Sequence, residues 1–162
     1  MAYAENTSVS VEKTEAEIKA TLRRYGADRF MSGEDQTGAM ISFEMQDRRV
    51  TFRLPLPDQQ DKRFIYDGRR NVRTAPKQRE AWEQACRSRW RALLLCLKAK
   101  LESVESGIET FEDAFLAQIV MPDGGTVAEH VRPRIAEAYA ANTMQPLLPP
   151  HFRPEDGGRN DG

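Results

Sequence analysis

The first part of the chain has hydrophobic positions at helical spacing, which predicts a helix over residues 14–25. Thr14 and Glu17 have the spacing of a capping box, and Gly26 is placed to end the helix. The hydrophobic positions that recur at threes and fours are Ile18, Leu22 and Tyr25. We expect a short extended piece around Val9 and Val11 before this helix.

The next segment changes to a period of two, which is typical of half-buried strands. The alternating hydrophobic positions are Ala39, Ile41, Phe43 and Met45 in one run and Val50, Phe52, Leu54 and Leu56 in the next. Residues 46–48 form a polar turn between the runs, and Pro55 and Pro57 end the second because proline cannot donate to a ladder. An earlier strand over 29–32, followed by a turn at 33–38, completes a short antiparallel meander of three strands.

A long helix is predicted from about Pro76 to Gly107, after a polar and basic loop over residues 58–78. Its hydrophobic stripe consists of Trp82, Cys86, Trp90, Leu93, Leu97, Leu101 and Val104. At about 1.5 Å per residue this helix is the longest element of the chain. We expect both tryptophans to belong to the core.

Two further helices are predicted in the last third of the chain. The first begins with Thr110 and Asp113 and extends to about residue 119. The second begins with a Thr126–Glu129 capping box, carries Pro133 in its first turn and ends near residue 141. The fold class is therefore α+β, with an N-terminal helix, the meander, the long central helix and two or three C-terminal helices.

The domain organisation follows from length and from the composition of the two ends. A chain of 162 residues is expected to form one domain. We place this α+β domain at residues 9–144, after a flexible N-terminus at 1–8 and before a flexible tail at 145–162 that is rich in proline and glycine. No internal repeat is present.

Composition also indicates in which compartment of the cell the protein is expected. No apolar run approaches the roughly 18 residues that a membrane helix requires, so we expect no membrane contact. The first residues do not resemble a secretory signal. Cys86 and Cys96 belong to one predicted helix, ten residues apart, where a disulfide is geometrically implausible. We therefore expect the protein to be cytoplasmic, in a host cell.

Charge is unevenly distributed, although the formal net charge is only −1. Residues 48–100 contain 15 Lys or Arg and 5 Asp or Glu, a local net charge of +10. Residues 1–47 have a net charge of −4 and residues 101–162 a net charge of −7. A phosphate backbone or an acidic protein surface responds to such a local field.

The positive residues that could form a binding surface come from the third strand, the loop and the long helix. Phe64 and Tyr66 lie among the loop arginines, where they either stack on bases or are buried. The candidate nucleic-acid-binding residues are Arg49, Arg53, Arg63, Phe64, Tyr66, Arg69, Arg70, Arg73, Lys77, Arg87 and Arg91. An internal alternative stays open, in which Arg87 and Arg91 pair with carboxylates of the flanking helices, such as Glu102, Glu109, Glu112 or Asp113.

Residues that carry catalysis in other proteins are sparse in this chain. His130 and His151 are the only histidines, and neither has metal-ligand spacing to a cysteine. No glycine-rich phosphate loop follows a predicted strand. We expect a protein that is not an enzyme and that uses no cofactor and no metal.

Several segments resemble a family of uncharacterised proteins from tailed phages and prophages. They read VEKTEAEI at 11–18, LRRYGA at 22–27, VTFRLPLP at 50–57, WEQACRSRWRAL at 82–93, FEDAFL at 111–116 and LLPP at 147–150. This resemblance implies a phage setting and no particular chemistry.

The order of elements is similar to that of single-strand annealing proteins, in which a helix, a meander and a long helix carry positive charge. That resemblance implies a basic groove between sheet and helix, and often a ring of subunits. The positions that match are Arg49 and Arg53 on the sheet, Arg69, Arg70 and Arg73 in the loop, and Arg87 and Arg91 on the helix.

The functional hypothesis is an accessory phage protein that binds single-stranded nucleic acid in replication or recombination. The alternative is an inhibitor or adaptor that binds an acidic host protein through the same basic surface. A third possibility is a self-assembling protein that uses the tryptophan-containing stripe as a subunit interface.

Overall fold

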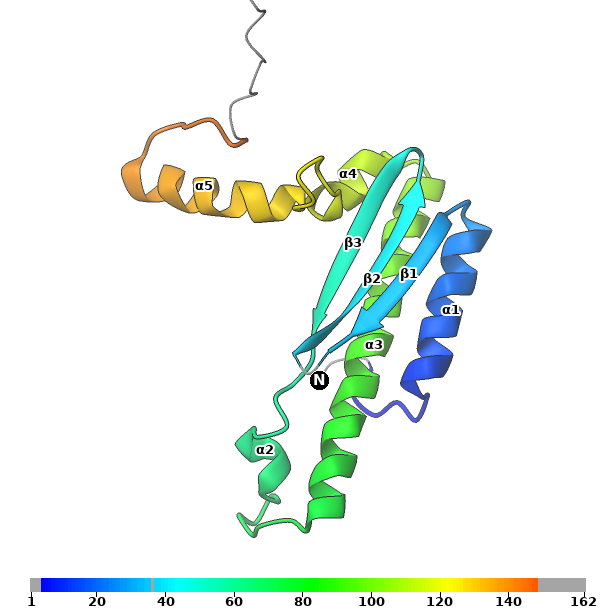
Figure 1. The fold of residues 1–162 in the computed structure, drawn as a ribbon, viewed down its shortest axis with the longest axis vertical. Helices are drawn as coiled ribbons and strands as arrows, with labels where there is room; N and C mark the ends of the chain where they lie inside the picture. The colour runs from blue at the N-terminus through cyan, green and yellow to red at the C-terminus, as the bar shows by residue number, and fades with distance from the viewer. Residues whose placement is uncertain (1–3, 36, 149–162) are drawn as a thin grey trace, which may run out of the picture.

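The computed structural model describes residues 4–35 and 37–148, and these form an α+β fold (Figure 1). The elements, in chain order, are α1 (Val11–Arg24), β1 (Asp28–Glu34), β2 (Gly38–Met45), β3 (Arg48–Pro55), α2 (Lys62–Ile65), α3 (Ala75–Glu105), α4 (Phe111–Phe115), the 3-10 turn η1 (Leu116–Gln118) and α5 (Val127–Ala141). The predicted fold class is confirmed.

The three strands form an antiparallel sheet in the order β1-β2-β3, as the alternation predicted. Ile41 lies opposite Phe52, and Phe43 lies opposite Val50. These side chains point to the face of the sheet that α1 and α3 cover, whereas the other face carries no helix of the described chain (Figure 1). Residues of even number on β2 and odd number on β3 therefore point away from the core.

The core lies between the sheet and the long helix α3. Trp90, Leu94 and Leu97 from α3 are buried against the inward face of the sheet. Phe43 and Phe115 meet edge to face, with ring centroids 6.0 Å apart, and so connect the sheet to α4. Full burial of one such side chain contributes about 1.5–3 kcal/mol.

The predicted start of the first helix needs correction. Ser10, not Thr14, is the N-cap of α1, and its side chain accepts a hydrogen bond from the Lys13 amide. The extended piece predicted around Val11 is therefore the first turn of α1. Thr14 is buried because it lies on the face that packs against α3. Gly26 ends the helix as predicted, at a φ of 91° that suits glycine.

The C-terminal helices keep the predicted order with different boundaries. Thr110 caps α4, but the helix ends at Phe115 and continues only as η1. The Thr126–Glu129 capping box of α5 is present. Pro133 lies in the second turn of α5 and not in the first, because the helix begins at Val127.

The N-terminal end of the domain also differs from the expected pattern. Residues 4–7, expected to be flexible, lie against α3: the Ser88 hydroxyl donates to the Ala4 carbonyl, and the Gln84 amide donates to the carbonyls of Glu5 and Thr7. The expectations for residues 1–3 and 149–162 fall outside the described residues.

The N-terminal part of α3 extends past the end of the sheet, where α2 packs beside it (Figure 1). The predicted loop 58–78 thus contains a short helix. At the other end of the sheet, α5 projects sideways, and none of its residues, all of which are described, is buried. No helix in the described ranges is long and apolar enough to cross a membrane.

Candidate nucleic-acid interface

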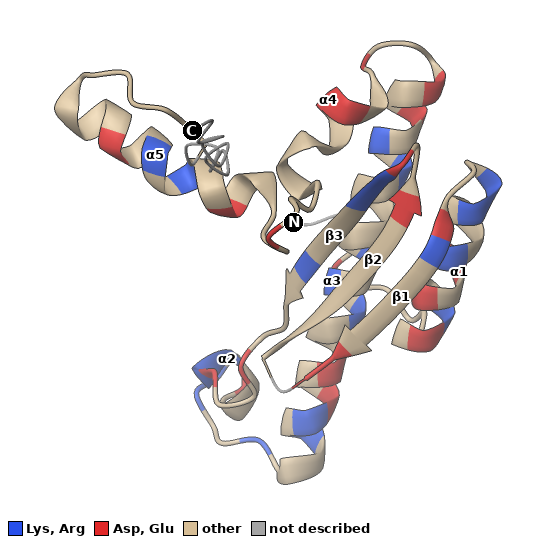
Figure 2. Cartoon of the chain, turned by 45° about the horizontal axis from the view of Figure 1, so that its top comes forward, with Lys and Arg blue, Asp and Glu red and all other residues tan. Residues whose placement is uncertain are grey.

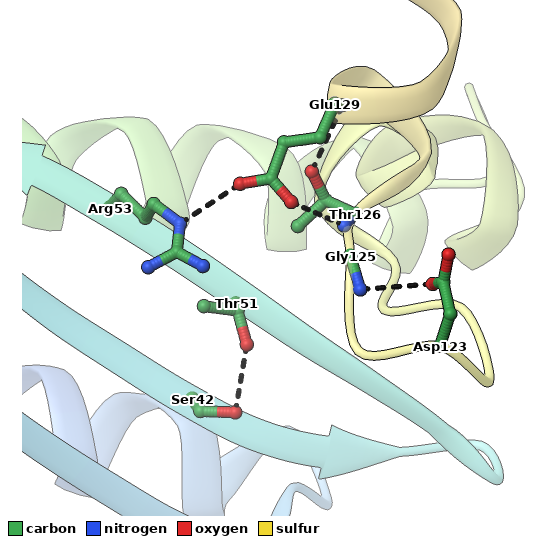
Figure 3. Close-up of polar contacts among 7 residues, drawn as sticks. All are labelled: Ser42, Thr51, Arg53, Asp123, Gly125, Thr126 and Glu129. Carbon is green, nitrogen blue, oxygen red and sulfur yellow. Dashed lines mark hydrogen bonds and ion pairs between the residues drawn. The ribbon is translucent and has the colours of Figure 1, made fainter.

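The sheet arginines lie on the uncovered face, as predicted, but both are paired with carboxylates. Arg49 Nη2 is 3.6 Å from Glu44 Oε1, and Arg53 Nε is 3.1 Å from Glu129 Oε1 on α5 (Figure 3). The pKa of Glu129 is lowered by the Thr126 amide and by Arg53. Arg53 therefore ties α5 to the sheet, and its charge is partly neutralised.

Arg91 on the long helix is also paired with a carboxylate. Arg91 Nη1 lies 2.6 Å from Glu17 Oε2, and Lys98 Nζ lies 2.9 Å from the other oxygen of the same carboxylate. These two hydrogen bonds, the Lys98 bond being the larger effect, lower the pKa of Glu17. The pair with Glu17 joins α3 to α1. Because only 23% of the Arg91 side chain is exposed, it offers little surface to a ligand.

The expected single groove is therefore not formed. Arg49 and Arg53 point away from α1 and α3, and Arg53 contacts α5, whereas Arg91 lies between α1 and α3 on the covered side of the sheet. For Arg91, the alternative prediction of an ion pair with a carboxylate of another helix is confirmed. Its partner is Glu17 of the first helix, however, and not one of the predicted carboxylates.

The remaining positive residues gather around α2 and the start of α3, a region that we call the basic lobe (residues 61–80). It contains seven Lys or Arg and three Asp or Glu, a net charge of +4 (Figure 2). Arg63 pairs with Asp61 at 3.2 Å. Among the described residues, the other six cations have no carboxylate oxygen within 4.0 Å: Lys62, Arg69, Arg70, Arg73, Lys77 and Arg79.

A compact loop holds the central arginines of the lobe. Asp67 Oδ1 accepts hydrogen bonds from the amides of Arg69 and Asn71, both at 2.8 Å. The Arg70 amide donates to the Asp67 carbonyl at 2.9 Å, and Arg70 takes a left-handed φ of 65°. These amides, the Asn71 amide first, lower the pKa of Asp67. The carboxylate thus fixes a turn with Arg69 and Arg70 at its tip.

The base of this loop is closed by backbone pairing. Tyr66 and Val72 form an isolated β-bridge, and the Arg73 amide donates to the Ile65 carbonyl at 2.8 Å. The side chains of Tyr66 and Val72 are 41% and 68% exposed. The loop therefore presents one aromatic ring and one apolar side chain beside its arginines.

Phe64 does not share this exposure. It is 4% exposed, and its ring lies 4.6 Å from the guanidinium carbon of Arg63. The stacking role considered for Phe64 is wrong, because α2 turns its ring toward α3. Tyr66 remains the only one of the two aromatic residues with an accessible face.

Arg87 lies on α3 just beyond the lobe, about two helical turns after Glu80. Its guanidinium donates to Gln84 Oε1, with an Nε distance of 3.2 Å. Arg73, Lys77 and Arg87 line one side of a shallow cavity of about 340 Å³ on α3. Cations of the loop and of the helix therefore share a surface here, together with Glu80.

Sequence reasoning missed three contributors to the lobe. Lys62 and Arg79 were not singled out, although the same excess of positive charge includes them. The missed residue with the clearest sequence signal is Asp67, because Asp67-Gly68 between extended residues is typical of a tight turn.

Trp82 also differs from the prediction. Trp90 is buried, but Trp82 is only half-buried, and its indole nitrogen donates to the Pro57 carbonyl at 2.6 Å. In the described ranges, no group of three or more His, Cys, Asp or Glu residues is placed to hold a metal ion.

Comparison with protein-family models, with curated proteins and with solved structures finds no match to this chain. The functional argument therefore depends on the geometry of the basic lobe.

Proposed function

We propose that this chain is a non-catalytic protein that binds single-stranded nucleic acid through the basic lobe. The observation that carries the proposal is the loop braced by Asp67, which presents Arg69 and Arg70 without carboxylate partners in the described chain, next to the exposed ring of Tyr66. The phage resemblance suggests the setting, in which an accessory protein meets single strands during replication or recombination.

The proposed mechanism combines phosphate neutralisation with base stacking. Arginines at the tip of a braced turn lose little conformational entropy when they meet phosphates, and bound counterions are released from the strand. If about four phosphates are neutralised, log K falls with log salt at a slope near −3. Stacking of one base on Tyr66 adds about 1–3 kcal/mol.

The first experiment is a fluorescence-anisotropy titration of a labelled single strand at several salt concentrations. We compare the wild type with the Arg69→Glu/Arg70→Glu double variant, which is expected to abolish binding. The matched control is Arg23→Glu/Arg24→Glu, which changes charge equally at the exposed end of α1, far from the lobe (Figure 1). A flat salt response, or equal losses in both double variants, would contradict the proposal.

Asp67→Ala tests whether the shape of the loop matters in addition to its charge. This variant makes the chain more positive, so a purely electrostatic surface would bind more tightly. We expect weaker binding, because the amides of Arg69 and Asn71 lose their acceptor and the turn loosens. Tighter binding would show that the braced conformation is unimportant.

Substitution of Tyr66 separates nucleic acid from other polyanions. Tyr66→Ala is expected to lower affinity for the strand while Tyr66→Phe retains it, because only the aromatic face is needed. Competition with polyglutamate supplies the second arm. If polyglutamate displaced the strand as well as an unlabelled strand does, and Tyr66→Ala had no effect, the lobe would be a site for acidic protein surfaces.

A further inference from the structure

A cleft of about 630 Å³ lies outside the basic lobe, between the start of α1, the end of β1 and the middle of α3. Its volume falls within the roughly 300–1,000 Å³ that is typical of small-molecule sites. The apolar part of its lining consists of Val11, Leu56, Trp82, Cys86 and Trp90. Both tryptophans of the chain therefore line this one cleft.

Four of the remaining lining residues are glutamates, and these carboxylates come from three different elements. Glu12 and Glu15 belong to α1, Glu34 ends β1, and Glu83 belongs to α3; Figure 2 shows acidic segments on these elements. In the part of the chain that the structure describes, none of the four has a Lys, Arg or His nitrogen within 4.0 Å. Glu15 accepts a hydrogen bond from the Ser32 hydroxyl.

Two of these carboxylates raise the pKa of Cys86, which belongs to the apolar part of the lining. Burial is the main reason why the pKa of the Cys86 thiol is raised to about 11, and the charges of Glu34 and Glu83 raise it further. Arg87 is the only basic residue of the lining and acts in the opposite direction. The cleft is therefore a region of negative potential above an apolar floor.

One hydrogen bond already orders part of the lining. The indole nitrogen of Trp82 donates to the Pro57 carbonyl, which fixes the orientation of this ring in the cleft.

We propose that this cleft binds an aliphatic di- or polyamine. Its ammonium groups would pair with carboxylates contributed by α1, β1 and α3. Its methylene segments would lie on Val11, Leu56 and the half-buried ring of Trp82. An ammonium group beside an indole face gains a further cation–π attraction. A neutral ligand would leave the carboxylates without compensation, and an anion would be repelled.

The test uses the intrinsic fluorescence of the full chain, freed of nucleic acid, because both tryptophans line the cleft. Titration with spermidine is expected to change the emission in a saturable manner with one site per chain. A diol of similar length at the same ionic strength should cause no saturable change. A linear response to spermidine, or the same response to sodium chloride, would overturn the proposal.

Variants locate the site. Glu34→Gln/Glu83→Gln is expected to weaken spermidine binding by about tenfold or more, since two partially screened charge pairs are lost. Glu102→Gln/Glu105→Gln is the matched control, with the same charge change at exposed positions near the other end of α3. Equal affinities in the two double variants would overturn the assignment. Thermal unfolding checks that all variants fold, as expected for exposed side chains.

Two further measurements distinguish polyamine binding from strand binding and from protein docking. Arg69→Glu/Arg70→Glu, which should abolish strand binding, is expected to leave the spermidine response unchanged, so either proposal can fail alone. A lysine-containing peptide with blocked ends is the second ligand to be titrated. If the peptide bound and spermidine did not, the cleft would be a protein-docking site and the small-ligand proposal would be wrong.

Discussion

The arginines of the sheet and those of the basic lobe belong to one run of positive charge in the sequence, yet their surroundings differ. Arg48, Arg49 and Arg53 each lie within 4.0 Å of a glutamate carboxylate. Arg69 and Arg70 have no such partner in the described chain and stand at the tip of a braced loop. The first group is engaged in ion pairs within the domain, and the second group is available for a ligand.

The paired arginines connect elements that are far apart in sequence. Arg48 joins β3 to α4 through Glu112, Arg53 joins β3 to α5 through Glu129, and Arg91 joins α3 to α1. Exposed pairs of this kind contribute only about 0.2–1 kcal/mol each. Their main effect is therefore to orient helices on a body that the apolar core stabilises.

The strongest contrast between body and lobe is expected from their buried aromatic residues. Phe43→Ala removes a fully buried ring from the main core and should lower the free energy of unfolding by about 3–5 kcal/mol. Phe64→Ala should cost clearly less, because α2 packs only at the extended end of α3. Urea denaturation measures both changes. Equal losses would show that the lobe unfolds together with the body.

A smaller effect is expected from breaking one of the helix-joining pairs. Arg91→Met keeps the apolar stem and leaves Glu17 with Lys98 alone, so we expect a loss of about 1 kcal/mol in urea denaturation. Arg89→Met on the same helix is the control, since Arg89 is exposed and has no carboxylate within 4.0 Å in the described ranges. If both variants lost the same stability, the pairing would not be the cause.

The same pair makes stability depend on pH. Glu17 has a lower pKa in the folded protein than its ordinary value of 4.5, so the unfolded chain binds its proton first as the pH falls. The contribution of Glu17 is therefore complete above about pH 5 and is lost as the pH falls through the folded pKa. The stability difference between wild type and Glu17→Gln should shrink on acidification. A difference independent of pH would contradict this account.

The smallest effect on stability is expected in the lobe itself. Arg69→Glu/Arg70→Glu should change the free energy of unfolding by less than about 0.5 kcal/mol, because both side chains are exposed. Thermal or urea unfolding of the same preparation used for binding provides the measurement. A loss as large as that of Arg91→Met would mean that these arginines are structural, and the contrast between the two groups would disappear.

Local patterns predicted most of the fold. The alternation at Ile41 and Phe43 located β2 and its buried face, and the hydrophobic stripe of the long helix located α3 within about two residues. Errors arose where two local signals competed. Either Ser10 or Thr14 could serve as the N-cap of the first helix. In the structure Thr14 is buried on the face that packs against α3, and Ser10 is the N-cap. Helix α2 was missed because four residues give no measurable period.

The candidate site was predicted less well. The sequence indicated every cation of the predicted surface, yet it did not distinguish Arg53 and Arg91, which are paired, from Arg69 and Arg70. Phe64 and Tyr66 are two residues apart in the same basic segment, and only the position of α2 beside α3 buries the first and exposes the second.

The sequence by itself determined the order of the main elements and the faces that β2, β3 and α3 bury, because side-chain periodicity is a property of neighbouring residues. Only the tertiary structure decided which charges remain available. The partners of Arg53 and Arg91 lie 76 and 74 residues away along the chain. The four carboxylates of the cleft likewise come from three elements. Charges separated so far in sequence influence one another only after the core has brought their elements together, because electrostatic interactions depend on distance in space.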